Sequence, residues 1–313
     1  MTSARGLLGK IRYRPEAPGV PSRLGNAGEA WHAFCRDRFA VAGLAIILLV
    51  AVCAVFAPWI APEDPTLGVG RDRLLPPLTE EHLLGTDGQG RDILSRLIWG
   101  ARISLTTGVV PTVAAIVVSV VLGLTAGYFQ GWFGQLVMRV LDIFLAFPLV
   151  LLGVALVSVL GPGMTNVMVS LVLVEIPYMT RLVFTETSLL RSREFVVAAK
   201  VCGSGTPQIL LREILPNVFS TLIVYSTTIV GSMIVLAAGF SFLGIGIQPP
   251  TADWGIMTSD GRLVLSKAPY VATIPGLTIA LVALAFTWVG DGLRDALDPR
   301  IRRGFRRASE AAA

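Results

Sequence analysis

The chain has 313 residues, of which 53% are hydrophobic and 15% are charged, and its mean hydropathy is +0.70. Soluble domains carry about a quarter charged residues, so this composition excludes a soluble enzyme and a disordered chain and indicates a membrane protein. The net charge of +5 is modest, and no basic run with interleaved aromatic residues favours nucleic acid. The cysteines Cys35, Cys53 and Cys202 are scattered, which predicts neither a disulfide framework nor a metal site.

Uncharged apolar stretches predict an all-α membrane protein with six transmembrane helices. The first covers residues 39–60, and the second has its apolar part at 105–128. The next long stretch must divide into helices at 142–160 and 165–184, because Gly161-Pro162-Gly163 cannot lie inside a regular helix. The fifth helix begins near Ile214 and the sixth covers 268–290, with a polar segment at 248–267 between them.

The first apolar stretch has two competing interpretations. A cleaved signal peptide is disfavoured, because the polar leader of 38 residues and the apolar stretch are both too long. Lipidation at Cys53 is disfavoured as well, because branched Val52 replaces the small residue that a lipoprotein cleavage site needs. A retained helix is the preferred interpretation.

The distribution of lysine and arginine predicts the orientation of the chain. One side of the membrane holds 19 of these residues and the other holds 7. Because cytoplasmic segments keep positive charge during insertion, both termini are predicted to be cytoplasmic. The resulting organisation is a cytoplasmic tail at 1–38, the first helix at 39–60, an extracytoplasmic segment at 61–102, a core of five helices at 103–290 and a cytoplasmic tail at 291–313.

The extracytoplasmic segment contains a glycine-rich turn. Its Gly85-x4-Gly90 spacing superficially resembles a phosphate-binding loop, but Arg91 and Asp92 stand where Lys and Ser or Thr are required. A calcium loop is equally poor, because a third carboxylate and the terminal bidentate Glu are missing. We expect a tight turn whose carboxylates bond to the backbone or to Arg91 and Arg96, with no metal. The residues expected to shape this turn and a docking surface for a receptor are Gly85, Thr86, Asp87, Gly90, Arg91 and Asp92.

The cytoplasmic segment at 185–216 predicts two short amphipathic helices around a Gly203-x-Gly205-x-Pro207 turn. One stripe of the first helix consists of Phe195, Ala198, Ala199 and Cys202. Spacing alone leaves two interpretations open, a connecting loop folded on its own apolar face and a docking element for another protein.

Few charges fall within the predicted spans. Glu175 lies halfway along the fourth and most needs a polar surrounding, since an ionised group at mid-bilayer costs several kcal/mol unless it faces protein or water. It is predicted either to line a pore, where it would attract an amino terminus or a cation, or to bond to a partner subunit. Tyr178 shares its face, Asp142 begins the third span, and Arg181 is expected to snorkel to the inner interface.

Several sequence blocks resemble one known family over residues 31–302. The chain is similar to the C-type permease subunit of dipeptide and oligopeptide ATP-binding-cassette importers, which have the type I importer permease fold. The family's coupling loop is matched at Ala198, Ala199, Gly203, Leu215 and Pro216, whereas Val197 replaces the usual Glu and Phe184 a common Arg. The other matching blocks are Gly85-Thr86-Asp87-x-x-Gly90-Arg91-Asp92, Ser95-Arg96, Gly100-Ala101-Arg102-x-Ser104-Leu105, Ala146-Phe147-Pro148, Phe242-Leu243-Gly244-Ile245-Gly246, Pro249-Pro250, Trp254-Gly255 and Gly290-Asp291-Gly292-Leu293-Arg294-Asp295-x-Leu297-Asp298-Pro299-Arg300.

The resemblance implies a non-catalytic half of a translocation pore in the cell inner membrane. Its partners would be a homologous permease subunit, two ATPase subunits and an extracytoplasmic solute-binding protein, surrounded by membrane lipid. The chain would bind no cofactor, and ATP and Mg would act on the ATPase subunits. The residues implied in coupling to them are Glu194, Val197, Ala198, Ala199, Lys200, Gly203, Leu215 and Pro216.

Di- and oligopeptides are the leading solutes, with nickel or glutathione as alternatives. A rival hypothesis is an ion-coupled secondary transporter that relays protons through Glu175 and Asp142. Such transporters usually have more spans and matching internal repeats, which are not evident here. A purely structural membrane subunit is a third hypothesis.

Overall fold

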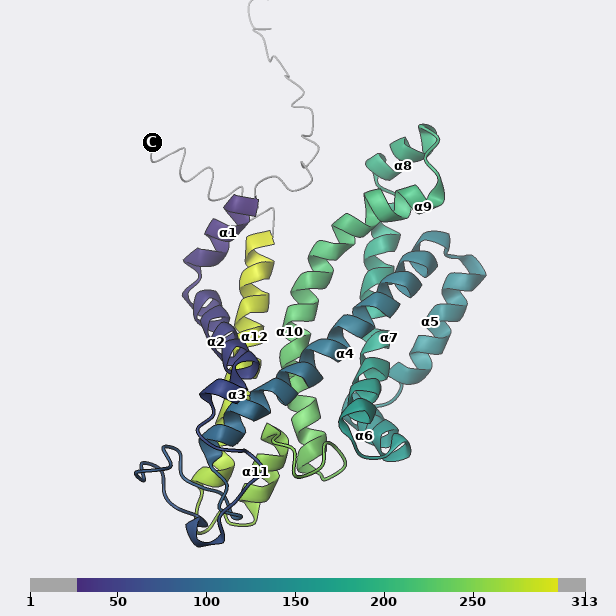
Figure 1. The fold of residues 1–313 in the computed structure, drawn as a ribbon. Coiled ribbons are helices and arrows are strands. Elements are labelled where there is room, and N and C mark those ends of the chain that lie inside the picture. Colours follow the sequence, from purple (N-terminus) through teal and green to yellow (C-terminus); the bar gives the residue numbers. More distant parts are fainter. Residues whose placement is uncertain (1–26, 298–313) are drawn as a thin grey trace, which may run out of the picture.

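A computed structural model of the chain describes residues 27–297, which form an all-helical bundle (Figure 1). The tails at 1–26 and 298–313, with the last residues of the Gly290 block, lie outside the described residues. The elements are α1 (Ala27–Arg36), α2 (Arg38–Val55), α3 (Ala57–Ile60), a 3₁₀ turn (Gly70–Asp72), α4 (Ile93–Phe129), α5 (Gly131–Leu145), α6 (Leu149–Leu160), α7 (Met164–Arg191), α8 (Glu194–Val201), α9 (Thr206–Gln208), a π-helical turn (Ile209–Ile214), α10 (Leu215–Phe242), α11 (Trp254–Arg262) and α12 (Tyr270–Leu297).

Five helices in this part of the chain are long and apolar enough to cross a membrane, and a bent pair can supply a sixth span. The five are α2, α4, α7, α12 and the continuous helix Thr206–Phe242. The sixth consists of α5 and α6, which meet at an angle of 87°. This count agrees with the predicted all-α membrane fold.

The expected third span at 142–160 is wrong as a continuous helix. The chain breaks at residues 146–148, because Pro148 has no N–H to donate and disfavours helical geometry at the residue before it. The 12-residue α6 is only about 18 Å long, too short to cross about 30 Å of hydrocarbon alone. The division at 161–163 is confirmed, since α6 ends at Leu160 and α7 begins at Met164.

Two other boundaries differ from the expectation. Helix α4 starts at Ile93, twelve residues before the apolar part, because Asp92 caps its first turn and the polar side chains there are buried against other elements. The second short helix expected after Pro207 is not separate, because α9 and the π-helical turn continue directly into α10. Hydrophobic length alone could not locate either boundary.

Helices α4 and α7 pack closely because α4 presents small residues to its neighbour. A Cβ atom on Gly123 would lie 2.6 Å from Val183 Cβ, and one on Gly127 would lie 2.8 Å from the carbonyl oxygen of Phe184. This Gly-x-x-x-Gly spacing is typical of helix pairs in membranes, where close backbone approach replaces the hydrophobic effect as the source of contact. The α4–α7 pair therefore forms the centre of the bundle.

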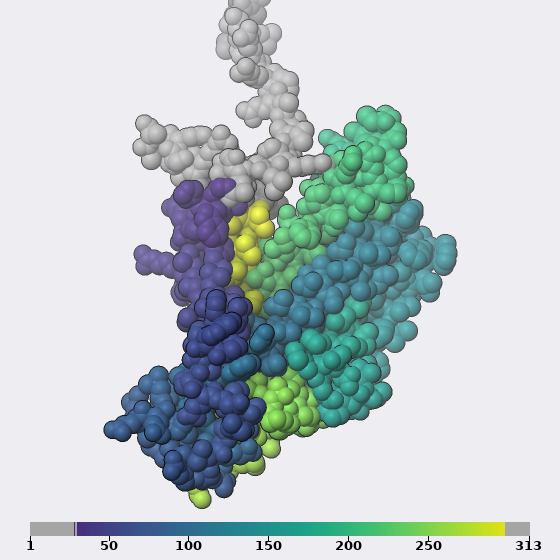
Figure 2. Space-filling view, in the orientation of Figure 1, coloured from purple at the N-terminus to yellow at the C-terminus, as the bar shows by residue number. Residues whose placement is uncertain are grey.

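The two ends of the bundle carry different elements (Figure 1). One end carries α1, the end of α12 and the α8–α9 region, and the opposite end carries α11 and residues 61–92. Figure 2 shows residues 61–92 as a separate lobe beside α11 at the end of the helices. Helix α4 extends from this lobe towards the α8–α9 end.

Candidate functional site

The lobe at residues 61–92 is closed by the predicted glycine turn. Gly85 and Gly90 have φ values of +78° and +77°, and Cβ atoms there would lie 2.4 and 2.0 Å from backbone oxygens. Only glycine therefore fits both positions. Thr86 and Asp92 form an antiparallel bridge that closes the turn, and Ile93 donates its backbone N–H to the Gly85 carbonyl.

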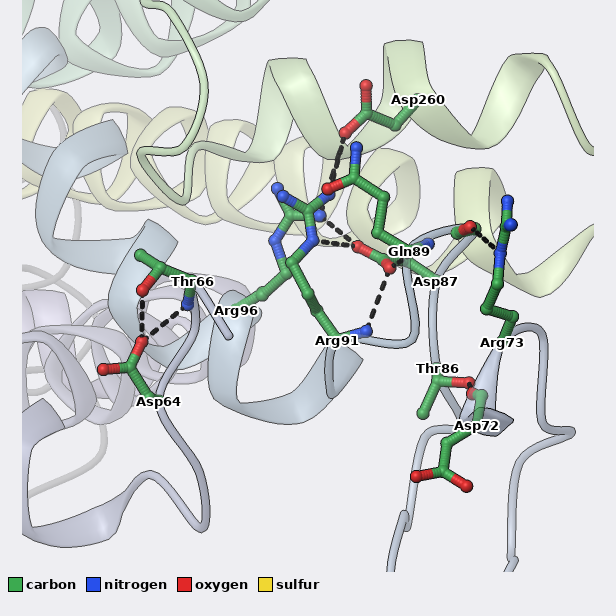
Figure 3. A network of polar contacts seen from close by, with 11 residues as sticks. Asp64, Thr66, Asp72, Arg73, Thr86, Asp87, Gln89, Arg91, Arg96 and Asp260 are labelled. Atoms are coloured by element: carbon green, nitrogen blue, oxygen red, sulfur yellow. Dashed lines mark hydrogen bonds and ion pairs between the residues drawn. The ribbon is translucent and has the colours of Figure 1, made fainter. Parts of the chain in front are cut away.

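Asp87 organises a buried cluster of charges inside the turn (Figure 3). Its Oδ1 accepts hydrogen bonds from the backbone N–H groups of Gln89 (2.7 Å) and Arg91 (3.1 Å). Its Oδ2 accepts from Arg91 Nε at 2.7 Å and from Arg96 Nη1. The prediction that this carboxylate bonds to the backbone and to both arginines is confirmed.

Electrostatics hold Asp87 in its charged form. Burial alone would raise the pKa of this carboxyl, but Arg96, Arg91 and the backbone donors outweigh burial and hold the pKa below its usual range. The carboxylate is therefore ionised at neutral pH and offsets part of the positive charge of the two buried arginines.

Asp260 links the cluster to α11. Its Oδ2 lies 3.2 Å from Arg91 Nη2 and 3.8 Å from Arg96 Nη1. Trp254 Nε1 also joins α11 to α4 by donating to the carbonyl oxygen of Leu97, and the Tyr270 hydroxyl joins α12 to the lobe by donating to that of Leu75. We name the group Asp87, Arg91, Arg96 and Asp260 the outer cluster. It ties the lobe, the start of α4 and α11 into one unit.

Asp92 has a different task from Asp87. It caps α4 by accepting the Ser95 backbone N–H at 2.7 Å, and its other oxygen lies 3.1 Å from His82 Nδ1. Neither His82 nor Asp260 was singled out from the sequence, and only their distant partners reveal their roles.

Burial corrects one expectation about receptor docking. Gly85, Thr86, Asp87, Gly90, Arg91 and Asp92 are all buried, so they can shape a docking surface but cannot form its contact face. The exposed positions around them are Arg71, Arg73, Leu78, Glu80, Glu81, Leu83 and Gln89.

At the other end of the bundle, α8 presents an apolar outer face. Val196 is its one fully buried side chain, whereas Val197 and Val201 are 48% and 83% exposed. Phe195, Ala198 and Cys202 of the predicted stripe are also exposed, so the stripe faces away from the bundle. A loop folded only on its own apolar face would bury them.

The turn after α8 requires glycine. Gly203 has a φ of +82°, its N–H donates to the Lys200 carbonyl, and the Ser204 N–H donates to the Ala199 carbonyl. These are bonds of a glycine-terminated helix end. Beyond the turn, Ile209 and Ile214 are buried, Leu215 is half-buried and Pro216 is exposed at the start of α10.

Glu175 lies inside the bundle at 1% exposure. Its carboxylate interacts with the Tyr225 hydroxyl of α10, while its Oε1 has no hydrogen-bond partner among the described residues. Tyr225 also lines a groove of about 490 Å³ between α7, α10 and α12, together with Thr221, Thr228, Asp291 and Arg294. The half-buried Tyr178 interacts with Tyr225 as well.

Asp142 is placed apart from Glu175. It lies in the last turn of α5, outside α6, and its Oδ1 accepts a 2.7 Å bond from Arg181 Nη2. Arg181, expected to snorkel, also forms an exposed ion pair with Asp142. The structure does not unite Asp142 and Glu175 in one relay.

The described bundle thus has a short helix with an exposed apolar face at one end and an ordered lobe at the other. Residues 119–303 match the family of binding-protein-dependent transport system inner membrane components, and residues 26–77 match the N-terminal TM domain of oligopeptide transport permease C. The chain belongs to this permease family. It is a multi-pass inner membrane protein and a transporter subunit, not itself an enzyme.

Curated relatives match most of the chain. The di/tripeptide transport system permease protein DppC of Pseudomonas aeruginosa (strain UCBPP-PA14) is 43% identical over 279 residues, covering 88% of this chain and 92% of the relative. The glutathione transport system permease protein GsiD of Escherichia coli O6:K15:H31 is 43% identical over 274 residues, covering 88% and 90%. GsiD of Pectobacterium atrosepticum is 41% identical over 275 residues, covering 88% and 91%.

A solved structure shares the fold. An inward-facing structure of the MetNI methionine ABC transporter superposes with a TM-score of 0.53 at 19% identity, covering 65% of this chain and 97% of that chain. Family membership implies a partner permease, ATPase subunits that use ATP and Mg, and a binding protein.

Proposed function

We propose that this chain forms one half of the translocation pathway of an ATP-driven importer for di- and oligopeptides. It receives solute from an extracytoplasmic binding protein at the lobe of residues 61–92 and couples to a separate ATPase through residues 194–216. The exposed apolar face of α8 carries the coupling half of this proposal, because such a face beside a fixed glycine turn suits docking to a protein partner.

The relatives support peptides as the solute class. One is named for di- and tripeptides and the other for glutathione, itself a tripeptide with an ammonium group and carboxylates. The partner set that we propose is one homologous permease, two ATPase subunits and one binding protein.

Reconstitution tests the transport proposal. The complex with its partners is placed in proteoliposomes, and uptake of a labelled dipeptide, a labelled tripeptide and labelled glutathione is measured. We expect uptake of the dipeptide and tripeptide that requires both ATP and the binding protein. Uptake driven by a proton gradient without ATP would contradict the importer proposal, and ATP-driven uptake of glutathione alone would contradict the di- and oligopeptide proposal.

We propose that Glu175 and Tyr178 act on the solute indirectly, through Tyr225. Glu175 is too buried for direct contact, but its carboxyl group interacts with the Tyr225 hydroxyl at the wall of the groove. In its ionised form this group would favour a protonated amino terminus. Asp142 lies on α5 and is paired with Arg181, so it is the weaker pore candidate.

The same proteoliposomes test this arrangement. Glu175→Gln keeps the shape of the side chain and removes its charge, so we expect about a tenfold higher KM for peptides with a free amino terminus, the scale of one charged hydrogen bond. Uptake of an N-acetylated peptide serves as the internal control and should not change. Equal effects on both peptides would show that Glu175 only supports the packing of the bundle.

A further inference from the structure

Lys200 is exposed, and its ammonium group contacts an aromatic ring of this chain. Its Nζ lies 5.1 Å from the ring centre of Tyr128, near the end of α4. Arg191, the last residue of α7, places its Cζ 5.9 Å from the same ring. The last residue of α7 and a residue in the last turn of α8 therefore each place a cation against one aromatic group.

The ring is well placed to hold these cations. Tyr128 is 8% exposed and packs in one apolar cluster with Val196, Ile209 and Ile214. A cation over a partly desolvated ring is attracted more strongly than one over a ring in water. Among the described residues, neither Lys200 nor Arg191 forms an ion pair with a carboxylate. The Tyr128 ring is therefore the group that their charged ends contact.

Helix α8 needs such a contact. It has eight residues and one fully buried side chain, and an isolated helix of this length is unstable in water. Its outer apolar face is left for the ATPase in the function proposed above. Val196 and the half-buried Ala199 pack on the inner side of α8, together with the pair formed by Lys200 and Tyr128.

The position of Tyr128 on α4 gives this contact a wider consequence. Helix α4 has 37 residues, about 55 Å of continuous helix, and its other end carries the Asp92 cap and Arg96 of the outer cluster. One helix thus joins the inner contact of α8 to the lobe at the opposite end of the bundle.

We infer that Tyr128 is a positioning residue for coupling. Its ring, which Lys200 and Arg191 contact, fixes α8 on α4. Displacement of α8 is therefore transmitted to α4. This inference rests on the proposed coupling of 194–216 to the ATPase. The chemistry that matters is the electron-rich face of the ring, not the hydroxyl or the side-chain volume.

Three variants separate these properties in the complete complex in lipid nanodiscs. Tyr128→Phe keeps the ring, Tyr128→Leu keeps an apolar side chain without a ring, and Lys200→Met removes the charge from an exposed position where folding is not at risk. Retention of the ATPase subunits, basal ATP hydrolysis and hydrolysis stimulated by the solute-loaded binding protein are measured for each.

We expect Tyr128→Phe to behave as wild type. Tyr128→Leu should keep the ATPase subunits and basal hydrolysis but reduce the stimulation by about fivefold, the scale of a partly buried cation–π contact. Lys200→Met should reduce the stimulation by the same factor. In a double-mutant cycle, adding Lys200→Met to Tyr128→Leu should reduce the stimulated hydrolysis little further. Arg193→Met is the control, because Arg193 is exposed and has no described contact with the ring. Its effect on stimulated hydrolysis should be the same in wild type and in Tyr128→Leu.

Each remaining result would overturn the inference. These results are full stimulation in Lys200→Met, a defect in Tyr128→Phe as large as in Tyr128→Leu, loss of the ATPase subunits from Tyr128→Leu, or additive effects of Lys200→Met and Tyr128→Leu. The wild-type complex separates this test from the proposed function. Absence of stimulation in wild type would contradict the proposed importer function and not the positioning role of Tyr128.

Discussion

Asp87 is the residue on which the outer cluster depends, because it is the one buried carboxylate that faces both buried arginines. Asp260 also contacts them, but it lies on α11 and is partly exposed, so water screens its charge. Removing Asp87 would leave two buried guanidinium groups with one partial counter-charge. Arg96 already has Nε and Nη2 without partners among the described residues. Loss of Asp87 would remove the hydrogen bond of its Nη1 as well.

We expect Asp87→Asn to destabilise the lobe by about 3 kcal/mol, since removing one partner of a buried ion pair leaves an uncompensated charge. Hydrogen exchange of residues 85–92 in nanodiscs would measure the loss of protection. Asp64→Asn is the matched control, because its carboxylate is exposed and its described bonds are to the nearby Thr66 and Leu67. Equal loss of protection in both variants would contradict the role assigned to Asp87.

The pH dependence of the lobe follows from the same residue. The folded pKa of Asp87 is below its usual value, so its contribution to stability is complete above the unfolded pKa of about 4 and is lost as pH falls through the folded pKa. Protection of residues 85–92 should therefore be constant from pH 7 to about 4 and decline below it. In Asp87→Asn this acid-dependent step should disappear.

At the scale of elements, the turn between α8 and α9 decides how the apolar face of α8 is presented. Gly203 and Gly205 lie two residues apart in this turn and are both exposed, but only Gly203 has a positive φ. At Gly205 the backbone is extended, with φ −68° and ψ 156°. The two glycines thus separate the effect of backbone strain from that of side-chain bulk.

We expect Gly203→Val to insert and assemble at least in part but to lose ATPase association or stimulated hydrolysis, because a β-branched residue at positive φ costs of order 1–3 kcal/mol. Gly205→Val should retain most of both activities. ATPase retention, hydrolysis and uptake are measured together in the reconstituted complex. A Gly203→Val complex with wild-type values of all three would remove residues 194–216 from the coupling role.

At the scale of the whole molecule, the lobe of residues 61–92 and helix α8 lie at opposite ends of the bundle (Figure 1). The charge distribution predicts that the lobe faces outward and α8 faces the cytoplasm. An importer needs this arrangement, since the binding protein and the ATPase act on opposite sides of the membrane.

An engineered thiol at Gly88 tests the orientation. The position is half-buried at the tip of the turn, and a Cβ there would lie no closer than 3.8 Å to the Val264 side chain, so cysteine should fit. We expect a membrane-impermeant maleimide to label Gly88→Cys in intact cells, in a background where Cys35, Cys53 and Cys202 are serine. Labelling only from the cytoplasmic side would reverse the predicted topology.

Composition and local spacing were sufficient for the features that depend on short-range physics. Hydrophobic length located most spans, the glycine and proline at 161–163 divided two of them, and the spacing around Gly85 and Gly203 identified two turns that need positive φ. Each of these depends on the transfer of a segment into lipid or on the backbone freedom of one residue.

Tertiary structure decided which distant groups meet. The pairing of Asp87 with Asp260 through two arginines, of Glu175 with Tyr225, and of Lys200 with Tyr128 joins residues from different helices. No local pattern marks these partners, because they become neighbours only when the helices pack. The same packing buried the residues expected at the docking surface and placed the exposed Lys200 against the Tyr128 ring. The sequence alone determined that the chain spans a membrane, since that depends only on the length and polarity of each segment.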